Sequence, residues 1–255
     1  MELWSDMHVK SLLPAAIIML VVAFVLRLTI GKKPLHIRMI PIKIFAIMIV
    51  LLEIGKQITS FQKGYDLYHI PLHYCSMLIF ALPAIAFYKG KHCETVRAVC
   101  TSLCMAMTLL TLIYPCLIYG AWNIENYWNS YFDFHTVTFH NLVILATFCI
   151  LALDLYTPQI KGEQKAIIIC IGIFCVISAT MAQILKTNYA NYYSCNIAPL
   201  ESVRLAVQTA AGYVPAQLLY ILIVSALNIL FTLLAYWVCR FVVRVTHRIK
   251  EKANC

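Results

Sequence analysis

Residues 12–30 read LLPAAIIMLVVAFVLRLTI, an apolar run in which Arg27 is the one charged side chain. An α-helix needs about 20 mostly apolar residues to cross the hydrocarbon core of a membrane. Lys32 and Lys33 follow the run, and no small-residue cleavage site is evident. The segment therefore predicts a retained first membrane span and not a signal peptide that is removed.

The composition of the whole chain extends this prediction. Of the 255 residues, 62% are hydrophobic and 12% are charged, whereas soluble domains have about 45–50% apolar and about 25% charged residues. Backbone groups in hydrocarbon must find hydrogen bonds within their own segment, which favours helices. We therefore expect an all-α transmembrane bundle that forms a single integral membrane domain over residues 1–255.

Seven segments are long and apolar enough, or nearly so, to be spans: about 12–30, 38–60, 71–88, 96–119, 136–156, 165–187 and 214–243. Four prolines in or near them are expected to start or kink the helices: Pro41, Pro83, Pro115 and Pro215. The longest stretch between the segments, 188–213, is expected to hold a short helix at the membrane surface.

The Lys and Arg residues predict an orientation, because short cytoplasmic loops are enriched in both. Fifteen of the 20 fall on one side of a seven-span arrangement: Arg27, Lys32, Lys33, Arg38, Lys43, Lys89, Lys91, Arg97, Lys161, Lys165, Arg240, Arg244, Arg248, Lys250 and Lys252. The other side has Lys10, Lys56, Lys63, Lys186 and Arg204. This division predicts an outer N-terminus and a cytoplasmic C-terminus. The basic tail is expected to lie against anionic lipid headgroups.

The net charge of +9 comes from these loops and the tail, so no nucleic-acid partner is expected. Nearly all of the 11 cysteines lie inside apolar runs, where cysteine is a small buried hydrophobic residue by default. Their spacing suggests neither a disulfide framework nor a metal site. The sequence therefore predicts no metal and no cofactor, and it leaves the oligomeric state open.

Polar side chains in or near the spans gather toward the predicted outer leaflet. They are Glu53, His69, His73, Asp133, His135, His140, Gln183 and Asn188. Ionisable groups at membrane depth are costly, so they are candidates for function. Two structural explanations stand beside this one: the histidines could hydrogen-bond neighbouring helices, and Glu53 could pair with Lys56 on the next turn. The aromatic segments NIENYWNSYFDF and TNYANYY are expected to form an outer aromatic belt.

Cys75 is a candidate nucleophile. Pro71 suits the first position of a helix, which would place Cys75 near the positive end of the helix dipole and favour its thiolate. His73 would point to a different face, so His140, at similar depth, is the better base. A Cys–His pair is the minimum set of residues for acyl transfer through a thioester. Asp133 or Glu53 could orient the histidine. The alternative is that Cys75 only fills the core.

The same residues carry a family resemblance. HIPLHYCSM, at residues 69–77, resembles the LPLHLCS motif of the bacterial YwaF family of integral membrane proteins. Other pieces of the sequence resemble that family in the same order along the chain. They are Glu53, the segment YFDFHTVTFHNL with His140, LKTNYANYYSC with Asn188, Tyr189 and Cys195, and AGYVPAQLLY. The resemblance covers roughly residues 40–240. That family is in turn similar to the eukaryotic transmembrane protein 164 family.

The resemblance implies a multi-pass protein of a bacterial plasma membrane. The transmembrane protein 164 family resembles cysteine-dependent phospholipid acyltransferases, which implies Cys75 and His140 as the catalytic pair and membrane lipids, a phospholipid or another acyl ester, as substrate. The expected substrate pocket includes Glu53, His73, Asp133, His135, Gln183, Asn188 and Tyr189. Two other functions remain open: a binding or transport protein that uses Glu53 and the histidines, and an accessory membrane subunit.

Overall fold

The computed structural model describes residues 3–157, 162–195 and 198–253, and within these ranges every regular element is a helix. The side chains of residues 198–200 and 247–253 are not described. Lys161, Arg248, Lys250 and Lys252, which entered the charge distribution, therefore lie outside the described side chains.

Five of the described helices are long and apolar enough to cross a membrane. They are α1 (Asp6–Ile30), α5 (Cys93–Ile113), α8 (Tyr131–Ala152), α9 (Glu163–Leu185) and α11 (Tyr213–Ala253), the last through its part Tyr213–Thr246. The prediction of an all-helical, multi-pass membrane protein is confirmed. α11 has 41 residues. At about 1.5 Å per residue, its length exceeds the roughly 30 Å thickness of the hydrocarbon core of a bilayer.

The other two predicted spans correspond to helices of a different kind. α3 (Ile40–Gln62) has 23 residues, and it carries the charged side chains Lys43, Glu53 and Lys56. α4 (Leu78–Phe87) has 10 residues, about half the length needed to cross. The 3₁₀-helix η2 (Tyr74–Met77) precedes it. Seven crossings therefore stay a prediction.

Prolines set several helix boundaries. Pro41 lies in the first turn of α3, as expected. The predicted span 96–119 is too long, because α5 ends at Ile113 and Tyr114 has an extended φ of −136°. Pro115, whose ring keeps the preceding residue out of the helical region, then starts the short helix α6 (Pro115–Ile118).

The connecting segments contain further short helices. These are α2 (Leu35–Arg38), η1 (Leu67–His69), α7 (Ala121–Glu125), η3 (Tyr189–Asn191) and α10 (Ala198–Ala211). The expected helix within residues 188–213 is thus present as α10.

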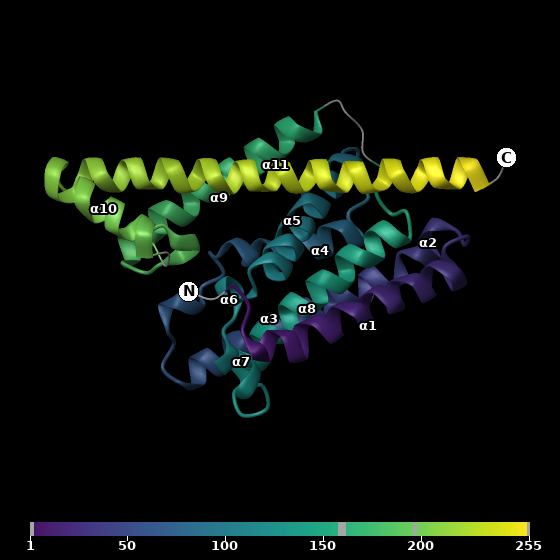
Figure 1. Ribbon diagram of the computed structural model, residues 1–255, viewed down its shortest axis with the longest axis horizontal. Coiled ribbons are helices and arrows are strands. Elements are labelled where there is room, and N and C mark those ends of the chain that lie inside the picture. Colours follow the sequence, from purple (N-terminus) through teal and green to yellow (C-terminus); the bar gives the residue numbers. More distant parts are fainter. Residues whose placement is uncertain (1–2, 158–161, 196–197, 254–255) are drawn as a thin grey trace.

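The helices pack around α5, which contacts α4, α8, α9 and α11. In Figure 1, α11 follows the long axis of the molecule and α9 crosses it, while α1, α3 and α8 lie together below. Thr108 of α5 donates to Thr147 of α8 at 2.8 Å inside this core. α3 and α8 approach closely because Gly55 has no Cβ: a Cβ there would lie 2.0 Å from the Tyr131 hydroxyl oxygen.

The end of the bundle where α1 ends and α2 lies is on the right in Figure 1, and we call it the basic end. Two arginines bind the end of α8 there. Arg27 of α1 pairs with the Asp154 carboxylate at 2.5 Å and also donates to the Ala152 carbonyl. Arg38 donates to the Leu153 carbonyl at 2.6 Å. Both arginines thus satisfy carbonyl groups at the end of α8 that have no partner within the helix.

We predict that Asp154→Asn lowers the free energy of unfolding by about 1 kcal/mol, because a charged hydrogen bond is lost at a partly exposed site. Asn tolerates the left-handed backbone at this position, where φ is 50°. Thermal unfolding in detergent measures the change. Thr29→Ala is the control, because Thr29 bonds only to carbonyls of its own helix. Equal stability of Asp154→Asn and wild type would contradict the prediction.

Candidate functional site

A buried ion pair on α3 is the centre of the candidate site. Glu53 Oε1 accepts from Lys56 Nζ at 2.8 Å and from Gln57 Nε2 at 2.7 Å. The side chains of Glu53 and Lys56 are 10% and 13% exposed. The structural alternative considered for Glu53, a pair with Lys56 on the next turn, is therefore confirmed.

Gln57 extends the pair to the segment before η2. Its Nε2 also donates to the His69 carbonyl at 2.8 Å, and its Oε1 accepts from the Tyr65 hydroxyl at 2.9 Å. Ser60 Oγ lies 2.7 Å from His69 Nδ1, and the His69 ring stacks on Phe132 of α8. These three hydrogen bonds fix the loop that leads to Cys75.

Burial lowers the pKa of His69, and the Lys56 ammonium lowers it further, while Asp66 raises it. A lowered pKa keeps an imidazole neutral at neutral pH. His69 is therefore able to accept or donate a hydrogen bond, but it adds no fixed positive charge to the site.

α8 contributes two histidines. His135 Nε2 lies 3.3 Å from Glu53 Oε2, at ion-pair distance but without the geometry of a hydrogen bond. One turn and a half further, His140 Nδ1 lies 2.7 Å from the Thr136 carbonyl oxygen. A carbonyl only accepts, so a neutral His140 carries its proton on Nδ1. Its Nε2 is buried and has no hydrogen-bond partner.

Cys75 lies in a helix that begins later than the one predicted. Pro71 does not start a helix: η2 begins at Tyr74, and Cys75 is its second residue. The backbone is also fixed from two other helices. Ser178 of α9 donates to the Leu72 carbonyl at 2.7 Å, and the Tyr74 hydroxyl lies 2.7 Å from Thr232 Oγ1 of α11. Cys75 therefore lies in the first turn of a helix, as expected, but that helix starts at Tyr74 and not at Pro71, and contacts from α9 and α11 hold the segment in place.

One charge connects these side chains. The ammonium group of Lys56 lies close enough to act electrostatically on Cys75 and on four histidines: His69, His73, His135 and His140. We call Lys56 and these five residues the Lys56 group, because they share the electrostatic influence of its ammonium. No hydrogen bond joins Cys75 to His140, because Nδ1 of the ring faces Thr136 and Nε2 has no partner.

Two further predicted pocket residues, His73 and Tyr189, contact each other and the η1 segment. His73 turns to the Tyr68 carbonyl, 3.0 Å from its Nε2, and its ring lies against Tyr189. Tyr189 is fully buried and donates to the Leu67 carbonyl at 2.5 Å. It borders the site and holds the η1 segment in place.

Asp133, Gln183 and Asn188 make structural contacts. Asp133 is in the first turn of α8 and accepts from Asn123 Nδ2 at 2.5 Å. Gln183 donates to the Tyr192 carbonyl at 2.9 Å. Asn188 Oδ1 accepts from the backbone amides of Tyr193 and Ser194, at 3.2 and 3.1 Å. None of these three side chains makes a hydrogen bond that the structure shows with Cys75 or His140, and their place in a substrate pocket stays a prediction.

Sequence reasoning considered Lys56 only as a partner of Glu53, and it missed the roles of Gln57 and Ser60. All three lie on α3 after Glu53, at spacings of three, four and seven residues. That spacing places them on one helix face, which was the available signal. It also missed a buried cluster at the basic end, where Glu163 Oε2 accepts from the Tyr156 and Tyr236 hydroxyls at 3.2 and 2.8 Å.

A second cysteine touches a histidine directly. Cys116 Sγ lies 3.7 Å from His8 Nδ1, which is also 2.6 Å from Ser5 Oγ. His8 and Ser5 form the capping box at the start of α1, and His8 Nε2 lies 2.9 Å from the Tyr119 carbonyl oxygen. Helix capping accounts for this contact, and Cys116 therefore provides a matched control for Cys75.

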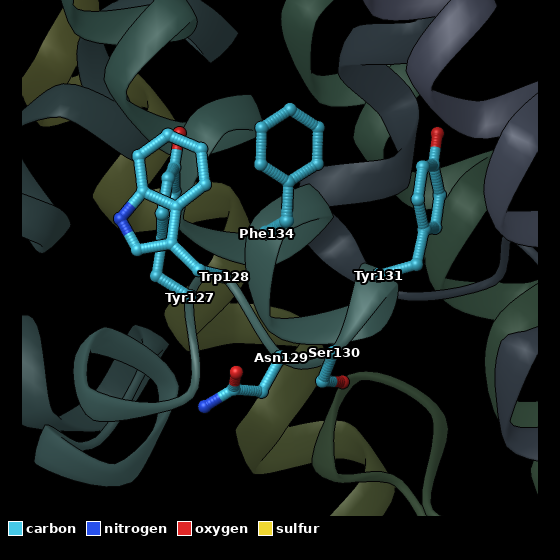
Figure 2. A pocket seen from close by; sticks show the side chains of 6 residues that line it. All are labelled: Tyr127, Trp128, Asn129, Ser130, Tyr131 and Phe134. Atoms are coloured by element: carbon cyan, nitrogen blue, oxygen red, sulfur yellow. The ribbon is translucent and has the colours of Figure 1, made fainter.

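A small hollow of about 220 Å³ lies at the turn between α7 and α8. Figure 2 shows the rings of Tyr127, Trp128, Tyr131 and Phe134 extending to one side of the turn, with Asn129 and Ser130 at its base. Trp128 is 86% exposed. This hollow belongs to the predicted aromatic segment and contains none of the Lys56 group. Among the described residues, no group of three or more His, Cys, Asp or Glu side chains could hold a metal ion.

The comparison with protein families gives one match. The model of the TMEM164 family covers residues 3–238 of the chain. The chain belongs to the TMEM164 family. This confirms the resemblance to the transmembrane protein 164 family, while the YwaF name and the bacterial plasma membrane stay predictions. The comparisons with curated proteins and with solved structures gave no match.

We predict that Glu53→Gln lowers the free energy of unfolding by roughly 3 kcal/mol, because it leaves the Lys56 ammonium buried without its carboxylate. Glu53→Gln/Lys56→Met should recover most of that loss, since neither charge remains. Thermal unfolding in detergent compares the variants. Lys63→Met, at the exposed end of the same helix, should change stability little. A double variant as unstable as the sum of its single variants would show that the two charges are not coupled.

Proposed function

We propose that this TMEM164-family protein is a cysteine-dependent lipid acyltransferase or hydrolase, with Cys75 as nucleophile and His140 as general base. The observation that carries the proposal is the buried Nε2 of His140, which has no hydrogen-bond partner and belongs to the same Lys56 group as Cys75. Buried polar atoms are nearly always hydrogen-bonded. An unpartnered imidazole nitrogen is therefore available to accept a proton.

The proposed reaction has two steps. His140 Nε2 takes the proton from Cys75 Sγ, and the thiolate attacks the ester carbonyl carbon of a lipid. The ester C–O bond breaks, the leaving alkoxide takes the proton from His140, and a thioester forms on Cys75. An acceptor hydroxyl, or water, then gives its proton to His140 and attacks the thioester carbonyl carbon. The C–S bond breaks, and the released Cys75 thiolate takes the proton back from His140. Acyl transfer and hydrolysis differ only in this acceptor.

The charges around Cys75 suit this chemistry in part. The Lys56 ammonium stabilises a thiolate, while the Glu53 carboxylate opposes it. Because Glu53 is held at 2.8 Å from Lys56, the pair adds little net charge beside the thiol before an ester is bound. The reaction requires Cys75 and His140 to come within hydrogen-bond distance in that complex, as catalytic contacts often tighten only with substrate.

The same ion pair argues against the transport alternative. A carboxylate that carries protons or a substrate's charge across a membrane must exchange partners. Glu53 instead accepts from two neighbours on its own helix, Lys56 and Gln57, and Gln57 is itself fixed to the His69 carbonyl. Its surroundings favour a structural and electrostatic role beside the proposed nucleophile.

We predict that Cys75→Ala lowers acyl transfer by at least about 10³-fold, because it removes the nucleophile. Purified protein in mixed micelles would be supplied with a phospholipid that carries a labelled acyl chain and with a lysophospholipid acceptor. Cys116→Ala, the matched control, should retain activity. His140→Gln should lower the rate by about 10²-fold or more through loss of the base.

A hydroxylamine-sensitive acyl group on the peptide that contains Cys75 would support the thioester directly. Equal turnover by wild type and Cys75→Ala, or loss of activity in Cys116→Ala alone, would refute the assignment of Cys75.

We further propose that α3 and the η2–α4 segment complete seven crossings, with the N-terminus outside and the C-terminus in the cytoplasm. An odd number of crossings puts the termini on opposite sides. The prediction is that an antibody in the cytosol reaches a C-terminal epitope, and reaches an N-terminal epitope only after full detergent permeabilisation. Both epitopes on one side would exclude seven spans.

A further inference from the structure

A groove lies at the basic end of the bundle, near the start of α3 and the end of α4. The Cys75 site lies toward the other ends of these two helices. The groove lies between α2 with the start of α3 on one side and the end of α4 with the start of α5 on the other, and it has a volume of about 380 Å³. Its wall is mainly apolar and is formed by Leu35, Met39, Ile85, Ala86 and the ring of Tyr88. This volume lies within the range of small-ligand pockets.

Cations surround the groove. Lys43, Lys89, Arg97 and His36 line it, and no described lining residue is a carboxylate. Glu94 lies one turn before Arg97 on α5, and its carboxylate forms an ion pair with one terminal guanidinium nitrogen of Arg97 at 2.5 Å. The Nε of the same guanidinium is buried and has no hydrogen-bond partner. A buried donor without an acceptor is costly, so this site lacks an acceptor group that a ligand could supply.

The groove lies where the helices end. Lys43 is in the first turn of α3, Lys89 follows the end of α4, and Arg97 is one turn into α5. Since α5 is long and apolar enough to cross a membrane, its first turn lies near the headgroup layer. Basic pockets between membrane helices at this level suit anionic lipid headgroups.

We propose that this groove binds one anionic phospholipid, with the headgroup phosphate among Lys43, Lys89 and Arg97 and an acyl chain against Leu35, Met39 and Ile85. The charge of the rim selects the anionic headgroup, and the apolar wall selects a lipid over a soluble anion. A water-soluble phosphate would use the same cations and leave the apolar wall exposed. The proposal is independent of the acyl-transfer function, because it uses none of the Lys56 group.

Native mass spectrometry of the purified chain in detergent tests the proposal, with dioleoyl phosphatidylglycerol as the probe. Dioleoyl phosphatidylcholine tests the need for net negative charge, and glycerol 3-phosphate tests a free phosphate source. Lys43→Gln and Lys89→Gln should each weaken phosphatidylglycerol binding roughly fivefold, which corresponds to about 1 kcal/mol per cation.

The matched control is Lys32→Gln/Lys33→Gln, which removes two exposed lysines at the same end of the molecule that do not line the groove. It should change phosphatidylglycerol binding by less than twofold. Thermal unfolding shows whether each variant is folded. Lys89 is exposed and lies outside the helices, so Lys89→Gln changes no helical residue.

Three results would overturn the proposal: an equal loss in the control variant, equal binding of phosphatidylcholine by wild type, or glycerol 3-phosphate binding as tightly as the lipid. Selective loss of phosphatidylglycerol binding in the groove variants supports it.

Discussion

The ion pair between Glu53 and Lys56 is the interaction on which the polar end of the bundle depends. A lone charge on α3 at this depth would be strongly unfavourable. Paired at 2.8 Å and joined by Gln57, the two charges become acceptable. They then organise what surrounds them: His135 lies beside the carboxylate, and Gln57 holds the backbone that leads to Cys75.

The bundle separates its apolar surfaces from its hydrogen-bonding groups. The lipid-facing surfaces of α1, α9 and α11 are apolar and exposed, whereas hydrogen-bonding groups face inward around Lys56. Contacts from α9 and α11 fix the η2 backbone on the far side. Cys75 is thus held both by its own 3₁₀ turn and by contacts from other helices.

The two ends of the bundle differ in how they use charge. At the Lys56 end the charges are few and buried, and they are neutralised in place. At the basic end, Arg27 and Arg38 close the end of α8, while Lys43, Lys89 and Arg97 surround an apolar groove without a matching carboxylate in its described lining.

The sequence alone determined that the chain is a helical membrane protein, because hydrophobic runs such as residues 12–30 have no other stable use. It also identified the family through segments such as HIPLHYCSM, and it placed Glu53, Cys75 and His140 in one candidate site. Hydropathy did not separate α4, with its 10 residues, from a full span, because composition does not show where Tyr88 ends the helix. Tertiary structure alone decided that Lys56 is paired at a buried site, that Gln183 and Asn188 bond to the backbone of residues 192–194, and that the helix with Cys75 begins as a 3₁₀ turn at Tyr74. Those outcomes depend on contacts between segments far apart in the chain, such as Ser178 with Leu72, which local spacing does not encode.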